Sequence, residues 1–193
     1  MNKLFATFCL LFSFSILTGC QKKEEPPKSP YTGASYFSII EYGSDQFRTY
    51  WGQPFSLEKI RTEDGKVTDS SIVPAARVDW AKVLKPFFES DISHPKYLDQ
   101  YTFSSVDDDL TNSRTYIYEA KDKKLFTQML QIATDPFTNK IKSVFIETRD
   151  GDKFRSQSQK LFYIPVKLIQ IQQFESSMLG KDKNIRTEYR FLY

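Results

Sequence analysis

The side chains that could carry chemistry in this sequence are two thiols, one imidazole, clusters of carboxylates and eleven tyrosines. One thiol, Cys20, follows Leu17-Thr18-Gly19 at the end of an apolar run that begins after Lys3. A basic start, an apolar stretch and small residues at a cleavage point are the layout of a secretory signal peptide. We therefore expect residues 1–19 to be a signal peptide, which places the mature domain outside the cytoplasm.

The residues Leu17, Thr18, Gly19 and Cys20 resemble the lipobox of bacterial lipoproteins. The resemblance implies that the Cys20 thiol is diacylated, that residues 1–19 are removed and that the new amino terminus is acylated. The alternatives are an ordinary signal peptide or a transmembrane helix. The apolar run is shorter than the roughly twenty residues that span a bilayer, and a charged segment follows it. Two or more acyl chains give stable membrane anchoring.

Residues 20–35 are expected to be the acylated cysteine and a tether, because charge, Pro, Gly and Ser dominate them. Their first part is similar to the charged export signal of surface lipoproteins in Bacteroidota-type bacteria: Gln21, Lys22, Lys23, Glu24 and Glu25. Lys23 departs from that signal, where an acidic residue is more usual, and a plain solvated linker is the alternative. Asp at position 21 would favour inner-membrane retention in many Gram-negative lipoproteins. We expect an outer-membrane location, with surface exposure as one of its two forms.

The remaining chemical groups give little support for an enzyme. His94 is the only histidine, it lies in a turn-like stretch before Pro95, and no G-x-S-x-G motif accompanies it. With Cys9 in the signal peptide, Cys20 is the only mature thiol, so neither a disulfide nor a cysteine metal site is expected. No phosphate-binding glycine loop is present. We expect no cofactor.

Two acidic segments are candidates for turns first and for metal loops second. Asp107-Asp108-Asp109 lies near Thr111 and Asn112, but the spacing of an EF-hand is absent. Asp150-Gly151-Asp152 has the composition of a hairpin turn. Paired carboxylates distant in sequence leave a carboxylate-dependent hydrolase of a cell-surface polymer as an alternative function.

Six tyrosines are candidates for an exposed aromatic binding face, although core packing explains most of them: Tyr97, Tyr101, Tyr116, Tyr118, Tyr163 and Tyr189. Positive and negative residues interleave and the net charge is only +3, so nucleic-acid binding is not expected.

Two helices must position these groups. Apolar residues from 35 to 51 recur at helical spacing, with Gly43 inside the run and Pro54 beyond it. A stronger pattern follows Asp79, which we expect to cap the helix. Its apolar positions are Trp80, Val83, Leu84, Phe87, Phe88 and Ile92, which we interpret as core. Pro86 should kink this helix or confine its regular part to one side.

Extended runs make up the rest of the chain. Residues 55–62 and 66–72 flank Asp64-Gly65, which predicts a tight hairpin. Seven further strands are expected at 100–106, 113–120, 124–134, 141–149, 153–164, 166–175 and 184–193. In the last one, Ile185, Tyr189, Phe191 and Tyr193 should face the core, and Arg186, Glu188 and Arg190 should face water.

We expect one α+β domain over residues 36–193, with two N-terminal helices packed on a mainly antiparallel, meandering β-sheet. Asp79-Trp80, residues 87–92 and residues 160–163 resemble small α+β lipoproteins of Bacteroidota-type bacteria. These are packing motifs, so the resemblance implies no activity. The expected function is a membrane-anchored, non-enzymatic binding or assembly module for another envelope protein or a glycan.

Overall fold

The computed structural model describes residues 36–50, 52–152, 154–178 and 180–193. The expected signal peptide, lipobox and tether therefore lie outside the described residues. Two helices, α1 (Ile39–Tyr50) and α2 (Trp80–Glu89), flank the hairpin of β1 (Ser56–Glu63) and β2 (Lys66–Pro74). Seven strands follow: β3 (Tyr101–Asp108), β4 (Ser113–Ala120), β5 (Thr127–Thr134), β6 (Ile141–Gly151), β7 (Arg155–Ile164), β8 (Leu168–Ser177) and β9 (Lys183–Leu192).

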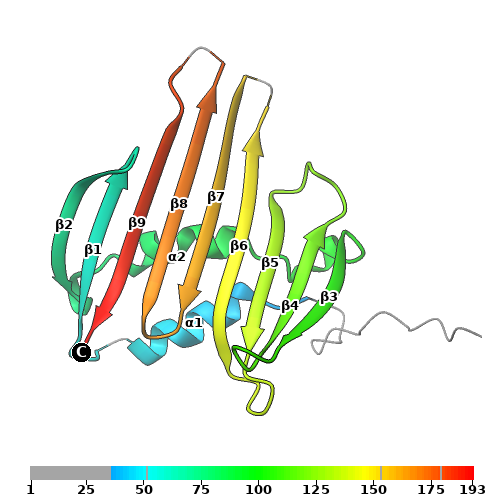
Figure 1. Ribbon diagram of the computed structural model, residues 1–193, viewed down its shortest axis with the longest axis horizontal. Coiled ribbons are helices and arrows are strands. Elements are labelled where there is room, and N and C mark those ends of the chain that lie inside the picture. Colours follow the sequence, from blue (N-terminus) through cyan, green and yellow to red (C-terminus); the bar gives the residue numbers. More distant parts are fainter. Residues whose placement is uncertain (1–35, 51, 153, 179) are drawn as a thin grey trace, which may run out of the picture.

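The strands form a single antiparallel sheet in the order β2-β1-β9-β8-β7-β6-β5-β4-β3 (Figure 1). From β3 to β9 each strand pairs with the next one along the chain, which is the predicted meander. The exception is β1, which pairs with β9 along its whole length, from Ser56 opposite Leu192 to Glu63 opposite Ile185. This pairing adds the first hairpin to the sheet beside the last strand.

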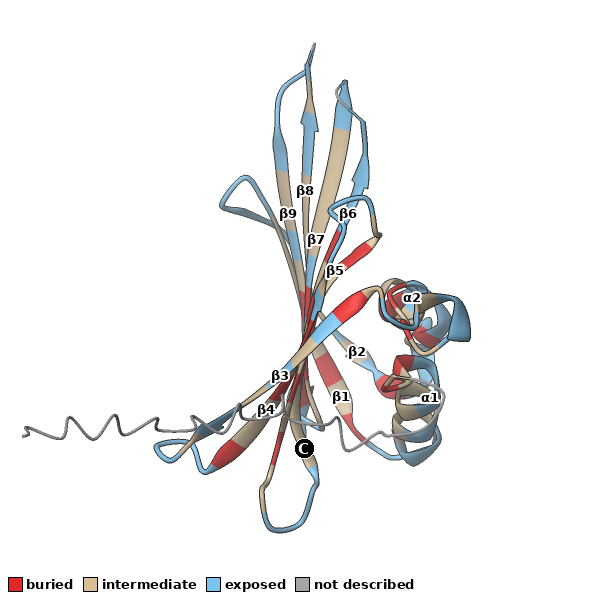
Figure 2. Cartoon of the chain, turned by 90° about the vertical axis from the view of Figure 1, so that its right-hand side faces the viewer, coloured by how far each residue is buried: buried red, intermediate tan, exposed pale blue. Residues whose placement is uncertain are grey.

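Both helices cover the same face of the sheet (Figure 2), so the molecule has two layers and one core between them. The residues that fill this core come from both helices and from the central strands; among the most buried are Leu57, Ile92, Tyr118, Leu130, Ile132, Ile146 and Leu161. The predicted α+β architecture, with two N-terminal helices on an antiparallel meander, is confirmed.

Each helix begins at a side-chain cap. Asp79 accepts a hydrogen bond from the backbone N–H of Lys82 (3.1 Å), as predicted for α2. Helix α1 is capped locally by Ser38, whose hydroxyl accepts from the N–H of Glu41 (3.1 Å). A distant residue adds to this cap, since the Asp91 carboxylate accepts from the N–H of Ile40 (2.9 Å) and from the hydroxyl of Ser38 (3.1 Å). Asp91 follows α2, and this bond therefore fixes the end of one helix beside the start of the other.

Pro86 lies inside α2, which continues to Glu89. A proline in a helix interior removes one backbone hydrogen bond and crowds the preceding turn. The helix ends with Ser90 as its C-cap, which is earlier than the apolar pattern to Ile92 predicts. Ile92 is nevertheless fully buried, because the segment after the helix runs into the core.

The Asp64-Gly65 turn has positive φ at both residues, 47° and 82°. This is the backbone that a tight hairpin turn needs, and the predicted β1–β2 hairpin is confirmed. Strand β9 is two-faced, with Phe191 buried in the core. The expectation that Tyr193 faces the core is wrong, since it follows the end of the strand and is 82% exposed. The expectation that Glu188 faces water is wrong: its side chain lies on the helix-free face but is buried, because Arg186 and Arg190 pair with it (3.3 Å and 2.7 Å) and cover it.

Candidate functional site: a groove between the two helices

The residues with a sequence-predicted chemical role, Leu17 to Cys20 and Gln21 to Glu25, lie outside the described residues. His94 lies in an exposed turn, where its Nδ1 accepts a hydrogen bond from the backbone N–H of Lys96 (3.1 Å). That bond caps the short 3₁₀ turn Pro95–Tyr97. His94 therefore has the role of a turn residue.

The acidic segments also act as turn residues. Arg114 donates two hydrogen bonds to Asp107 (2.6 Å and 3.0 Å), and this guanidinium lowers the pKa of the Asp107 carboxyl. Asp108 accepts from the hydroxyl of Thr111 (2.6 Å), which lowers its pKa in turn. Asp152 accepts from the N–H groups of Arg155 and Phe154, which lower its pKa.

A lowered pKa keeps these carboxyls ionised, whereas a general acid of a glycosidase needs a raised one. Within the described ranges, no group of three or more His, Cys, Asp or Glu side chains is arranged to hold a metal ion. The acidic turns therefore provide local structure in this part of the chain.

The tyrosines mostly fill the core. Tyr101, Tyr116, Tyr118 and Tyr163 are buried, and the Tyr101 hydroxyl donates to the carbonyl of Thr127 (2.9 Å). Burial raises the pKa of Tyr101. Only Tyr97 and Tyr189 of the six candidates are half-exposed, so the six do not form one binding face.

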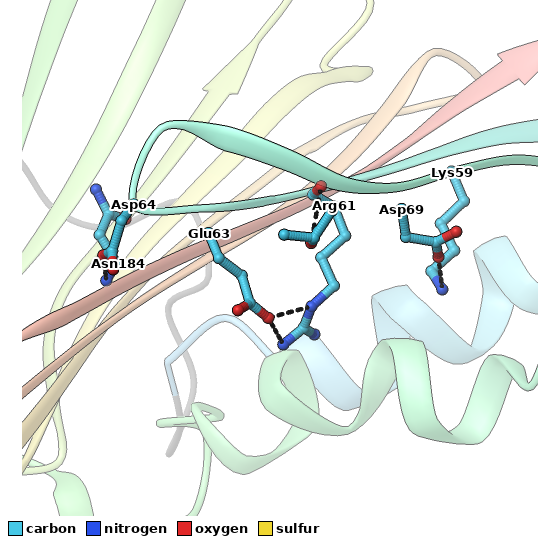
Figure 3. A network of polar contacts seen from close by, with 7 residues as sticks. Lys59, Arg61, Glu63, Asp64, Asp69 and Asn184 are labelled. Carbon is cyan, nitrogen blue, oxygen red and sulfur yellow. Dashed lines mark hydrogen bonds and ion pairs between the residues drawn. The ribbon is translucent and has the colours of Figure 1, made fainter.

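A polar network occupies the β1–β2 hairpin beside Tyr189 (Figure 3). Lys59 pairs with Asp69 (2.7 Å), Arg61 pairs with Glu63 (2.8 Å), and Asp64 accepts from the N–H of Asn184 (3.0 Å). The first two pairs lie within the hairpin and stabilise it, and the bond between Asp64 and Asn184 ties its turn to β9.

A hollow of the described surface lies between α1 and α2. It is a groove of about 430 Å³ whose lining is mostly apolar: Ser44, Phe47, Arg48, Trp80, Ala81, Leu84 and Phe88. The helices run past each other so that the ring of Phe47 meets that of Trp80 edge to face, with centroids 6.2 Å apart. Phe47, Leu84 and Phe88 are half-buried, and their exposed edges form the floor of the groove.

The groove continues inward as a smaller pocket between the helices and the sheet. This pocket of about 30 Å³ shares Phe47, Trp80, Leu84 and Phe88 with the groove and is otherwise lined by core side chains. At its wall the Tyr163 hydroxyl donates to Oε1 of Gln46 (3.1 Å), which joins the sheet to α1. An enclosed space of this size accommodates at most a methyl-sized group.

The close crossing of the helices sets the shape of the groove. Gly43 of α1 lies against the ring of Phe88, and a Cβ at position 43 would be 2.6 Å from Phe88 Cε1. The groove lies beside this close approach, against Ser44, Phe47 and Arg48 of α1.

The edge of the groove is polar. Arg48 is exposed and pairs with Asp45 one turn earlier (3.5 Å), and Lys85 pairs with Glu89 on the outer side of α2 (3.5 Å). An apolar floor with a charged rim is the arrangement of many protein-binding grooves. The site can therefore accept apolar side chains, and it offers no group for covalent or acid–base chemistry.

The sequence pattern assigned the α2 stripe to the core as a whole. The structure divides it: Trp80, Val83 and Phe87 are buried against the sheet, and Leu84 and Phe88 turn toward α1 and the groove. The pattern held no signal for this division, because positions 80, 83, 84, 87 and 88 are the usual apolar stripe of a helix packed on a core.

Comparisons with family models, with curated proteins and with solved structures gave no match. In the described part of the chain, neither helix is long and apolar enough to cross a membrane.

Proposed function

We propose that this chain is an outer-membrane lipoprotein, acylated at Cys20, whose domain binds apolar side chains of a partner envelope protein in the groove between α1 and α2. The observation that carries the binding role is the apolar groove of about 430 Å³ on the exposed side of the helix pair. The membrane role is supported by the lipobox residues Leu17 to Cys20 and by the charged segment after them.

A protein partner suits the groove better than a lipid or another small apolar ligand. The inner pocket is only about 30 Å³, so a ligand of lipid size would lie in the open groove with much of its surface in water. A protein that inserts a few side chains covers the groove with its own body and excludes water from the rim.

Photo-crosslinking in intact cells tests this role. A photoreactive amino acid replaces Ala81, which lines the groove, or Lys82, the next residue, which does not line it. We expect one discrete protein adduct from position 81 and none from position 82. The substitution Leu84→Trp, which fills the groove, should abolish the adduct. Equal adducts at both positions would refute groove binding, as would release of sugars from cell-surface polymers by the purified chain without any adduct.

The anchor has its own test. The substitution Cys20→Ala should abolish incorporation of labelled fatty acid and leave the product soluble or unprocessed. Unchanged labelling and membrane fractionation would overturn the lipoprotein assignment. Protease treatment of intact cells distinguishes the two faces of the outer membrane, since only a surface-exposed domain is degraded.

A further inference from the structure

One end of the sheet carries an exposed apolar residue on every turn. Because the strands alternate in direction, the turns β3–β4, β5–β6 and β7–β8 lie at the same end as the last residue of the chain, at the bottom of Figure 1. Their apolar residues are Leu110, Phe137 and Val166, and Tyr193 follows β9. Leu110 is 99% exposed, and Phe137 and Tyr193 are each 82% exposed.

Hydrogen bonds hold these four positions in place. Lys142 Nζ donates to the carbonyls of Thr111 (3.0 Å) and Asn112 (2.7 Å), which ties the turn of Leu110 to the base of β6. The Tyr193 hydroxyl donates to the carbonyl of Val166 (2.6 Å), which ties the chain end to the β7–β8 turn. The four apolar residues therefore lie on anchored segments at the same end of the sheet.

Val166 has φ of 59°, in the left-handed region. A β-branched side chain is strained there, and glycine or asparagine would be adopted at lower cost. The turn thus has a partly exposed valine at a position where asparagine or glycine would reduce the backbone strain. This favours a contact role for its side chain over a role in closing the turn.

The charged groups at this end suit a lipid headgroup layer. Asp107 and Asp108 are engaged by Arg114 and Thr111, and Asp135 accepts from the N–H of Thr138 (2.8 Å). Lys140 and Lys167 are exposed beside the apolar positions, and Asp109 is exposed in the first turn. Apolar tips flanked by lysines are typical of surfaces that dip into the membrane interface.

We infer that this end of the sheet rests on the bilayer, with Leu110, Phe137, Val166 and Tyr193 in its interface. The inference rests on the proposed acylation of Cys20. Fifteen residues lie between Cys20 and Tyr36, so this segment holds the domain within about 55 Å of the membrane at most. A tether of this kind limits the distance from the membrane but sets no orientation, whereas exposed apolar residues at one end of the sheet would set one.

The opposite end provides a matched control. There Phe154 and Met178 are 68% and 73% exposed, and their turns are joined by a hydrogen bond from the N–H of Met178 to the carbonyl of Phe154 (3.0 Å). The same turns carry exposed charges of both signs, among them Asp150, Asp152, Asp182, Lys181 and Lys183. The two ends thus carry similar apolar residues at opposite sides of the sheet.

Site-directed fluorescence tests the orientation. Leu110→Cys, Phe137→Cys and Phe154→Cys are each made in the full chain, and the membrane-extracted protein is labelled with an environment-sensitive thiol dye. The protein is then reconstituted into phosphatidylethanolamine–phosphatidylglycerol vesicles with or without nitroxide lipid. We expect a blue shift and loss of emission to nitroxide lipid at positions 110 and 137, and neither change at position 154. Equal quenching at all three positions, or quenching at 154 alone, would overturn the inference.

The proposed acylation of Cys20 is tested separately, on the parent protein. An acylated Cys20 leaves no free thiol in the mature parent, so the parent should take up no dye. If it does, the acylation proposal fails, and the same dye positions are compared in the Cys20→Ala chain added to vesicles. Quenching at 110 and 137 there supports contact of this end with lipid, and its absence overturns it.

Discussion

The substitution Gly43→Ala tests how the helix pair is packed and how the groove is kept open. An added Cβ would be 2.6 Å from Phe88 Cε1 and 3.4 Å from Cζ, so the aromatic ring must move by about 1 Å to reach ordinary van der Waals contact. These atoms are the far end of the Phe88 side chain, and that ring borders the groove of about 430 Å³. We expect the ring to swing into the groove.

Two terms of similar size set the stability of this variant. Alanine in place of glycine inside a helix stabilises by about 0.5–1 kcal/mol. Displacing the Phe88 ring from its rotamer costs about 0.5–1.5 kcal/mol. In the parent, the free energy of unfolding should therefore change by between a gain of about 0.5 kcal/mol and a loss of about 1 kcal/mol. In the Phe88→Ala background, where the ring is absent, Gly43→Ala should stabilise by about 1 kcal/mol.

Urea unfolding of the four proteins in this double-mutant cycle measures the difference. The displaced ring should also reduce the adduct from a photoreactive group at position 81, because it occupies the groove. If Gly43→Ala stabilised equally in both backgrounds, the close contact between Gly43 and Phe88 would not exist. If it destabilised by more than about 2 kcal/mol only with Phe88 present, the ring would have no room to move and the groove would be closed at that point.

Two further predictions concern the sheet. Arg114 lowers the pKa of Asp107 in the folded state, so the stability that this ion pair contributes is present above the ordinary carboxyl pKa near 4 and is lost as the pH falls through the lowered pKa. The substitution Asp107→Asn should therefore flatten the acid limb of a stability–pH profile. Asp109→Asn in the same turn is the control. The substitution Tyr101→Phe removes the hydrogen bond to the Thr127 carbonyl and should lower the free energy of unfolding, measured in urea, by about 1–2 kcal/mol. An unchanged midpoint of urea unfolding would mean that water replaces the hydroxyl.

Local sequence chemistry predicted most of the elements. The Asp64-Gly65 pair, the Asp79 cap and the alternation in the last strand each act over a few residues, so their effects can be read from neighbouring positions. Glu188 departs from its alternation because two arginines two residues away on the same face cover it, a result that depends on side-chain conformation.

Distant contacts were not predictable in the same way. The pairing of β1 with β9 joins residues more than a hundred positions apart, and no turn motif specifies it. The Asp91 cap of α1 is similar, because Asp91 is read locally as a turn residue. The groove depends on the crossing of α1 and α2 at Gly43. The sequence pattern indicates Gly43 only as a residue that weakens a helix.

The seam between β1 and β9 has a consequence for how the chain acquires its structure. Eight consecutive residue pairs join β1 to β9, so the β1–β2 hairpin cannot pair with the rest of the sheet until residues 183–192 are in place. Contacts of such wide sequence separation carry a large loop-closure entropy and slow the folding of antiparallel domains. In a nascent chain, helices α1 and α2 would have no completed sheet to pack against. The domain should therefore reach its native state only after β9 is free to pair with β1.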